Sequence, residues 1–133
     1  MALMKIGAQK YGDLCVGCHQ PHGGGNAGQA PPLAGSPWVL APGPNRLIRI
    51  PQCGVTGPIV VNGTEWNLPS MINFGATLSD EQLAGVLTYV RNSWGNNAPL
   101  VTPEQVAKVR GELKGRTDQF TVPELLKEPE EIK

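Results

Sequence analysis

Apolar side chains recur at steps of three and four residues in four stretches of the chain. Positions three and four apart share one face of a helix, so this spacing predicts four helices. They cover residues 3–14, 45–53, 80–94 and 103–114. Gly7 in the first helix permits the close approach of a neighbouring helix, because glycine has no side chain. We expect Tyr11 to pack on that neighbour.

Capping signals mark where the predicted helices begin and end. Ser79 stands before the third helix with Gln82 three residues on, which predicts a capping box. Thr102 opens the fourth helix with the same spacing. Gly95 predicts the end of the third helix. Pro51 lies inside the second, where a proline can cut a helix.

One stretch shows the pattern of a β-hairpin. Residues 59–61 and 64–66 are short β-rich runs on either side of Asn62-Gly63, a sequence that tight hairpin turns favour. The predicted fold class is therefore all-α with a short β-hairpin insert. We expect a core over residues 1–100. Residues 101–133 should form a C-terminal helix and tail, packed on the core or trailing from it, with the last residues frayed.

The amino-acid composition is that of a single domain whose loops wrap around a large bound group. The chain has 133 residues, with 17 Gly and 13 Pro but only 5% aromatic residues. Such a chain forms long irregular loops and supplies few large side chains of its own. The formal net charge is zero, which leaves no electrostatic basis for binding nucleic acid. No apolar run is long enough to span a membrane.

The chemistry of the chain centres on Cys15-Val16-Gly17-Cys18-His19. Two cysteines separated by two residues and followed by histidine are the attachment pattern of a c-type haem. On a helical turn the two thiols project to one side, where they can form thioethers with the two vinyl groups of a porphyrin. His19 then supplies an imidazole nitrogen as the proximal iron ligand.

Three other interpretations of the cysteines remain open. A dithiol redox pair requires a strand before the motif, whereas the preceding residues are predicted to be helical. A structural zinc site needs four ligands, which Cys15, Cys18, His19 or His22, and Cys53 can supply, but no second paired cluster is present. A disulfide between Cys15 and Cys18 would close a very tight ring and leave His19 unexplained.

Met71 is the candidate for the sixth iron ligand. It lies in an irregular segment just before the third helix, and a thioether on the opposite haem face is a standard ligand that raises the reduction potential. A single methionine can also be ordinary core packing. His22 is too close to His19 in the sequence to reach the other haem face.

Four more residues are candidates for contact with the haem. Pro31 offers a carbonyl in a stiff loop, and a proximal imidazole usually donates its second N–H to such a group. Trp66 is expected at the haem or its propionate edge. Arg46 and Arg49 can pair with propionates, because the guanidinium group matches carboxylates. For each of the four, an ordinary packing or surface role is the alternative.

Several segments together resemble the class I cytochromes c, and mono-haem bacterial domains most closely. These segments are the motif at 15–19, residues 31–36, Met71 before Phe74-Gly75, residues 78–81 leading into 87–91, and residues 89–95 with 101–104. The resemblance implies a cytochrome c fold around one covalently attached haem c, with Cys15 and Cys18 as thioethers. It also implies His19 and Met71 on the iron. Ile72 departs from the family, which often has proline after the ligand methionine.

The resemblance implies an electron carrier and not an enzyme, since two protein ligands leave the iron no site for a substrate. The expected partners are a dehydrogenase or respiratory complex as donor and a terminal oxidase or another cytochrome as acceptor. The chain is then a free carrier or the electron-transfer domain of a larger oxidoreductase. A haem-based domain that binds or senses small ligands by displacing Met71 is the alternative.

Haem is usually attached covalently outside the cytoplasm. We therefore expect a periplasmic or otherwise extracytoplasmic protein, whose leader or fusion partner is missing from this chain. We also expect a monomer, with Cys53 as a free thiol.

Overall fold

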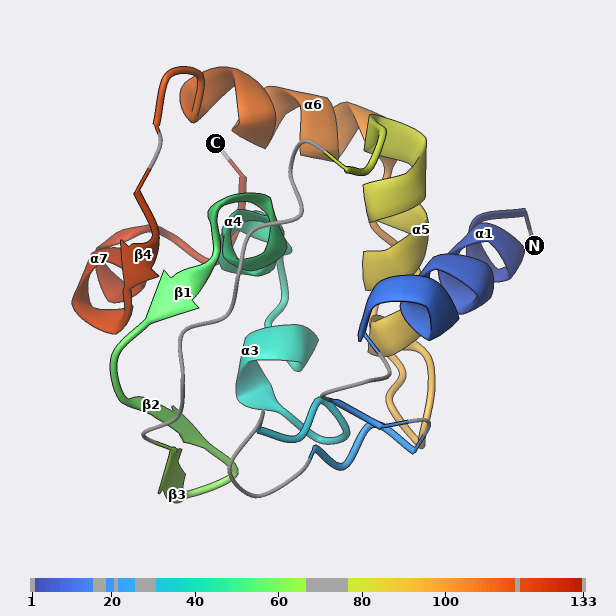
Figure 1. Ribbon diagram of the computed structural model, residues 1–133, viewed down its shortest axis with the longest axis horizontal. Coiled ribbons are helices and arrows are strands. Elements are labelled where there is room, and N and C mark those ends of the chain that lie inside the picture. The colour runs from blue at the N-terminus through green and yellow to red at the C-terminus, as the bar shows by residue number, and fades with distance from the viewer. Residues whose placement is uncertain are drawn as a thin grey trace.

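The computed structural model describes residues 2–15, 19–20, 22–25, 31–66, 77–116 and 118–132. In this part of the chain, helices share one hydrophobic core and two small sheets lie to one side (Figure 1). The helices are α1 (Ala2–Lys10), the π-helical turn η1 (Tyr11–Cys15), α3 (Pro37–Leu40), α4 (Asn45–Cys53), α5 (Asp80–Arg91), α6 (Pro103–Glu112) and α7 (Val122–Lys127). The strands are β1 (Val55–Thr56), β2 (Ile59–Val61), β3 (Thr64–Trp66) and β4 (Phe120–Thr121).

Helices α1 and α5 cross at close range (Figure 1). Gly7 is buried at the crossing, and a side chain there would collide with the backbone of Gly85. Tyr11 packs its ring on Tyr89 and Trp94, with centroids 5.4 and 5.3 Å apart. The expected close crossing and the packing of Tyr11 are both confirmed.

The predicted helix starts are also confirmed. Ser79 and Gln82 exchange side-chain and backbone hydrogen bonds at the start of α5, and Thr102 makes the same box at the start of α6. Helix α4 spans the predicted residues, and Pro51 inside it does not cut it short. One prediction about helix length was wrong. Helix α5 stops at Arg91, before the predicted end at Trp94, whose backbone is left-handed.

The sheets hold one predicted and one unpredicted pairing. Strands β2 and β3 form the expected antiparallel hairpin, with left-handed Asn62 and Gly63 at the turn. Strand β1 pairs in parallel with β4, so that Val55 lies beside Phe120. That pairing brings the C-terminal residues back to the middle of the chain.

The C-terminal segment is held in place, so the expectation of a frayed end was wrong for residues 128–132. The carbonyl oxygens of Glu128, Pro129 and Glu130 all accept hydrogen bonds from the start of α4. The backbone of Glu131 lies against Gly43. We call residues 128–132 the C-terminal strap; Figure 1 shows this end of the chain returning to α4.

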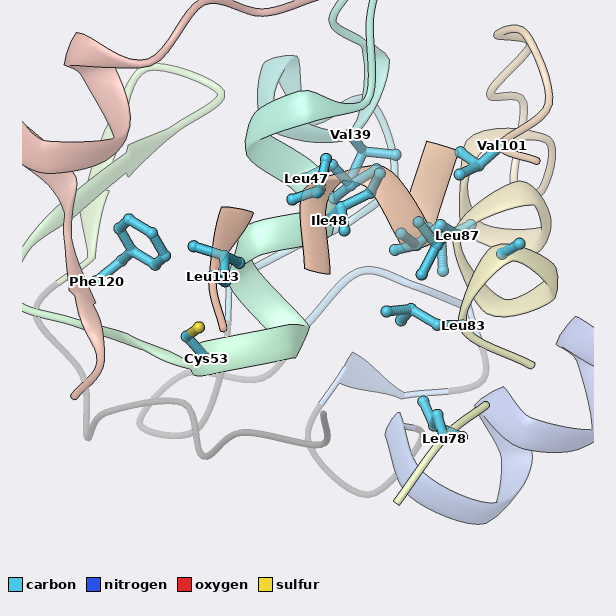
Figure 2. Close-up of a cluster of buried hydrophobic side chains, with 14 of the residues drawn as sticks. Val39, Leu47, Ile48, Cys53, Leu78, Leu83, Leu87, Val101, Leu113 and Phe120 are labelled. Atoms are coloured by element: carbon cyan, nitrogen blue, oxygen red, sulfur yellow. The ribbon is translucent and has the colours of Figure 1, made fainter. Parts of the chain in front are cut away.

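The hydrophobic core extends through the C-terminal extension as well as the first hundred residues. Figure 2 shows side chains from α3, α4 and α5 in one cluster with Leu113 and Phe120, and Ile48 in this cluster is fully buried. Helix α6 contributes Val106 and Val109, and α7 contributes Leu125. The extension therefore packs on the core. In the described part of the chain no helix is both long and apolar enough to cross a membrane.

Candidate haem site

The first cysteine of the motif lies at the end of the π-helical turn that follows α1. Helix α1 passes directly into η1, which ends at Cys15 with its thiol partly exposed. A π-helical turn is a rare geometry that often marks functional positions. Tyr11 fixes this turn to the next segment, since its hydroxyl donates to the carbonyl oxygen of Gln20 at 2.6 Å. Cys18 lies outside the described residues.

His19 is oriented as a proximal ligand requires. Its Nδ1 lies 3.0 Å from the carbonyl oxygen of Pro31. A carbonyl can only accept, so Nδ1 carries the proton and donates it, which leaves Nε2 unprotonated for a metal. Burial lowers the pKa of His19, and the hydrogen bond to Pro31 opposes that shift. The imidazole is therefore neutral at neutral pH, the form that binds iron.

Two arms of one loop hold His19 and Pro31 together. We call residues 19–36 the proximal loop, of which the structure describes 19–20, 22–25 and 31–36. The carbonyl oxygen of Gly23 accepts from the N–H groups of Leu33 and Ala34, at 2.7 and 2.9 Å. These bonds tie the arm with His19 to the arm with Pro31.

Trp66 is the last residue of β3, and its indole N–H is a buried hydrogen-bond donor. Its indole Nε1 is buried and has no hydrogen-bond partner among the described residues. A buried N–H without a partner costs stability, so such a group generally has an acceptor in the functional molecule. The propionates of a haem are acceptors of the required kind. This orphaned donor and the neutral His19 both fit a bound haem.

Arg46 and Arg49 contact the C-terminal segment. Arg46 donates from Nε to the carbonyl oxygen of Glu128 at 2.8 Å. Arg49 is buried, and its Nη2 lies 3.4 Å from carboxylate oxygens of Glu112 and of Glu128. A pocket of about 550 Å³ beside Arg49 is otherwise lined by residues between 112 and 128, and by none of the motif. The predicted propionate contacts of both arginines stay predictions.

The described residues give the zinc interpretation no support. They contain no group of three or more His, Cys, Asp or Glu side chains that could hold a metal ion. Cys53 is a buried free thiol in the same core cluster as Phe120 and Leu113 (Figure 2). His22 is exposed in a turn, where its Nδ1 accepts from the N–H of Gly24 at 2.9 Å. Met71 lies outside the described residues.

One polar residue of the site was missed from the sequence. Asn96 is buried in the turn after α5, and its side chain bonds to the proximal loop at Leu33 and Gly35. The only signal was its place directly after Trp94-Gly95 at the end of a helix. Asparagine is common in turns, so nothing in the sequence distinguished it.

Comparison with known proteins agrees with this geometry. The model of the cytochrome c family matches residues 4–94. Cytochrome c-552 of Thermus thermophilus is 35% identical over 118 residues, which cover 83% of this chain and 78% of that protein.

Two relatives are subunits of larger enzymes. The cytochrome c subunit of a quinone alcohol dehydrogenase from Gluconacetobacter polyoxogenes is 39% identical over 108 residues, or 78% of this chain and 22% of the subunit. The cytochrome c subunit of a gluconate 2-dehydrogenase from Pantoea cypripedii is 37% identical over 109 residues, or 80% and 24%. The chain thus spans less than a quarter of the dehydrogenase subunits it matches. It belongs to the cytochrome c family and is an electron carrier with covalently bound haem c.

Proposed function

We propose that this chain carries single electrons through a six-coordinate haem, with Cys15 and Cys18 as thioether anchors and His19 and Met71 as axial ligands. The hydrogen bond from His19 to Pro31 carries the proposal. It leaves Nε2 as the only ring nitrogen free to bind iron, and metal-binding histidines usually have such a partner on the other nitrogen.

The protein residues in this proposal keep the haem in place and tune it. When bound, haem c supplies an iron that cycles between the ferrous and ferric states. The carbonyl oxygen of Pro31 accepts a hydrogen bond from Nδ1 of His19. This bond fixes the imidazole ring and makes it a stronger ligand. Trp66 donates its buried N–H to a propionate, and Met71 closes the sixth position against substrates. The haem held by these residues would supply the one-electron chemistry, and a docked protein would receive the electron.

The partners that we propose are redox proteins. A dehydrogenase or respiratory complex acts as donor, and a terminal oxidase or another cytochrome acts as acceptor. Relatives named as subunits of dehydrogenases support a place beside such an enzyme, and cytochrome c-552 supports a free carrier. The balanced charge of the chain favours weak docking through apolar contacts over long-range steering. An extracytoplasmic, monomeric protein fits this role.

The visible spectrum of the purified protein tests the ligand set. We expect a low-spin reduced spectrum of c type and, in the ferric protein, the weak far-red band that reports sulfur on iron. Met71→Ala should abolish that band. Met4→Ala is the matched control, because Met4 lies on α1 away from the motif and should leave the band intact.

Other outcomes would reject parts of the proposal. A high-spin wild-type spectrum would contradict six-coordinate iron. A far-red band that survives in Met71→Ala would contradict Met71 as ligand. Reduction of the haem by a purified quinoprotein alcohol dehydrogenase, followed in the visible spectrum, tests the proposed class of donor; failure of that reduction would leave the ligand set standing and reject that donor.

A further inference from the structure

The side chain of Asn96 connects the end of α5 to the proximal loop. Asn96 is 7% exposed. Its Oδ1 accepts from the N–H of Gly35 at 2.8 Å. Its Nδ2 donates to the carbonyl oxygens of Val90, at 2.8 Å, and Leu33, at 3.2 Å. One buried amide therefore uses its acceptor and both donor hydrogens to join these segments.

The turn that carries Asn96 is held in an unusual backbone conformation. Trp94 and Gly95 both have positive φ values, of 55° and 88°. The N–H of Asn96 closes the turn by donating to the carbonyl oxygen of Ser93 at 2.9 Å. The ring of Trp94 lies so close to Gly23 that a side chain on Gly23 would collide with it. The turn thus contacts both arms of the proximal loop.

Leu33 links Asn96 to the carbonyl of Pro31. Its carbonyl oxygen accepts from Asn96, and its N–H donates to Gly23 at 2.7 Å. Only Pro32 separates Leu33 from Pro31, and the ring of a proline restricts the backbone there. The position of Leu33 therefore limits the directions in which the Pro31 carbonyl can point.

We propose that Asn96 is a positioning residue for electron transfer, which acts through Leu33 to hold the Pro31 carbonyl on Nδ1 of His19. A well-placed carbonyl makes the imidazole a stronger donor to iron. A stronger donor favours the ferric state and lowers the reduction potential. Loss of the Asn96 side chain frees the carbonyl and raises the potential. This inference rests on the proposed role of His19 as iron ligand.

Asn96→Ala and Thr88→Val together test the inference in the haem-loaded protein. Thr88 lies on α5, the helix that precedes Asn96; it is fully buried and exchanges two hydrogen bonds with Val101 away from the proximal loop. Both variants should lower the melting temperature. Only Asn96→Ala should raise the equilibrium constant for reduction by a redox mediator, by about threefold. It should also speed exchange of the His19 Nδ1 proton, followed by NMR.

Equal loss of stability in the two variants, with mediator equilibrium and proton exchange unchanged in Asn96→Ala, would overturn the inference. If Asn96→Ala does not yield a haem-loaded protein, Asn96→Ser takes its place. The serine hydroxyl is too short to reach Leu33, Gly35 and Val90 together, so the same rise in the mediator equilibrium is expected.

The test separates this inference from the proposed ligand set. A wild-type spectrum without histidine-ligated low-spin haem rejects the ligand set and the inference with it. A normal wild-type spectrum combined with an unshifted Asn96→Ala protein rejects only the positioning role of Asn96.

Discussion

Gly7 on α1 lies directly against the carbonyl group of Gly85 on α5, with no room for a side chain between the two helices. A Cβ on Gly7 would also come within 2.7 Å of the Cβ of Tyr89. We therefore expect Gly7→Ala to force the helices apart and to cost about 1–3 kcal/mol in the free energy of unfolding, measured by denaturant titration.

Gly12 provides the matched control for that crossing. It lies in η1, five residues further on, and a Cβ there would meet nothing within 4 Å. Because alanine favours helical backbone over glycine, Gly12→Ala should be neutral or stabilise by up to about 1 kcal/mol. Equal destabilisation by both substitutions would show that the crossing is not the cause.

Removal of the Trp66 indole N–H should change the haem and not the fold. If Nε1 donates to a propionate, Trp66→Phe leaves more negative charge near the iron, favours the ferric state and lowers the midpoint potential. Trp38→Phe is the control, because Trp38 Nε1 already donates to the carbonyl oxygen of Val60 at 3.0 Å. That variant should lose stability and keep its potential, measured by spectroelectrochemistry.

The opposite pattern would reject a propionate partner for Trp66. A donor that stays unsatisfied is better replaced by an apolar ring. In that case Trp66→Phe would stabilise the protein and leave the potential where it is in the wild type.

Gly43→Ala should loosen the C-terminal strap. A Cβ on Gly43 would lie 2.5 Å from Cα of Glu131 and 2.6 Å from the carbonyl oxygen of Glu130. That carbonyl accepts from the N–H of Asn45, so we expect the Asn45 amide to exchange faster with solvent. Amides of α5 should keep their protection. Slow exchange of the Asn45 amide in the variant would show that the strap tolerates the extra methyl group.

Glu124 makes the stability of the C-terminal helix depend on pH. A hydrogen bond from the backbone N–H of Thr121 lowers the pKa of this carboxyl group, with help from Arg116. A lowered folded-state pKa stabilises the fold above the unfolded-state value, and that contribution is lost as pH falls through the folded-state pKa. Glu124→Gln should therefore melt earlier than the wild type at pH 7.

The difference in melting temperature between Glu124→Gln and the wild type should shrink as the pH falls through the lowered pKa of the folded state, because the carboxyl group then becomes protonated. Glu65→Gln removes the same charge from an exposed position on β3 and serves as control. If the difference in melting temperature between Glu124→Gln and the wild type stayed the same at low pH, the loss of stability would come from altered packing and not from the lost charge.

Local signals in the sequence were enough to predict much of the fold and part of the site. Ser79 and Gln82 lie three residues apart in the first turn of α5, so their capping box depends on no distant residue. Asn62-Gly63 determines its own turn. The stiff proline loop next to a histidine ligand was enough to predict the contact between His19 and Pro31.

Contacts between distant segments could not be predicted in the same way. Strands β1 and β4 have two residues each, too few for a sequence pattern, and pair across most of the second half of the chain. Arg46 carries the charge expected for a propionate partner, but a guanidinium binds backbone carbonyls equally well. Which acceptors Arg46 binds depends on where the C-terminal segment packs. The sequence of a single helix does not contain that information. Asn96 escaped prediction for the same reason.

The parallel pairing of β1 with β4 has a consequence for the order in which the chain is made. A ribosome completes Cys53 and β1 long before Phe120, whose N–H later binds the carbonyl oxygen of Gly54 at 2.9 Å. During that interval Cys53 lacks Phe120, which belongs to the same buried cluster in the finished protein (Figure 2). The burial of Cys53 is therefore completed only after the C-terminal residues have been made.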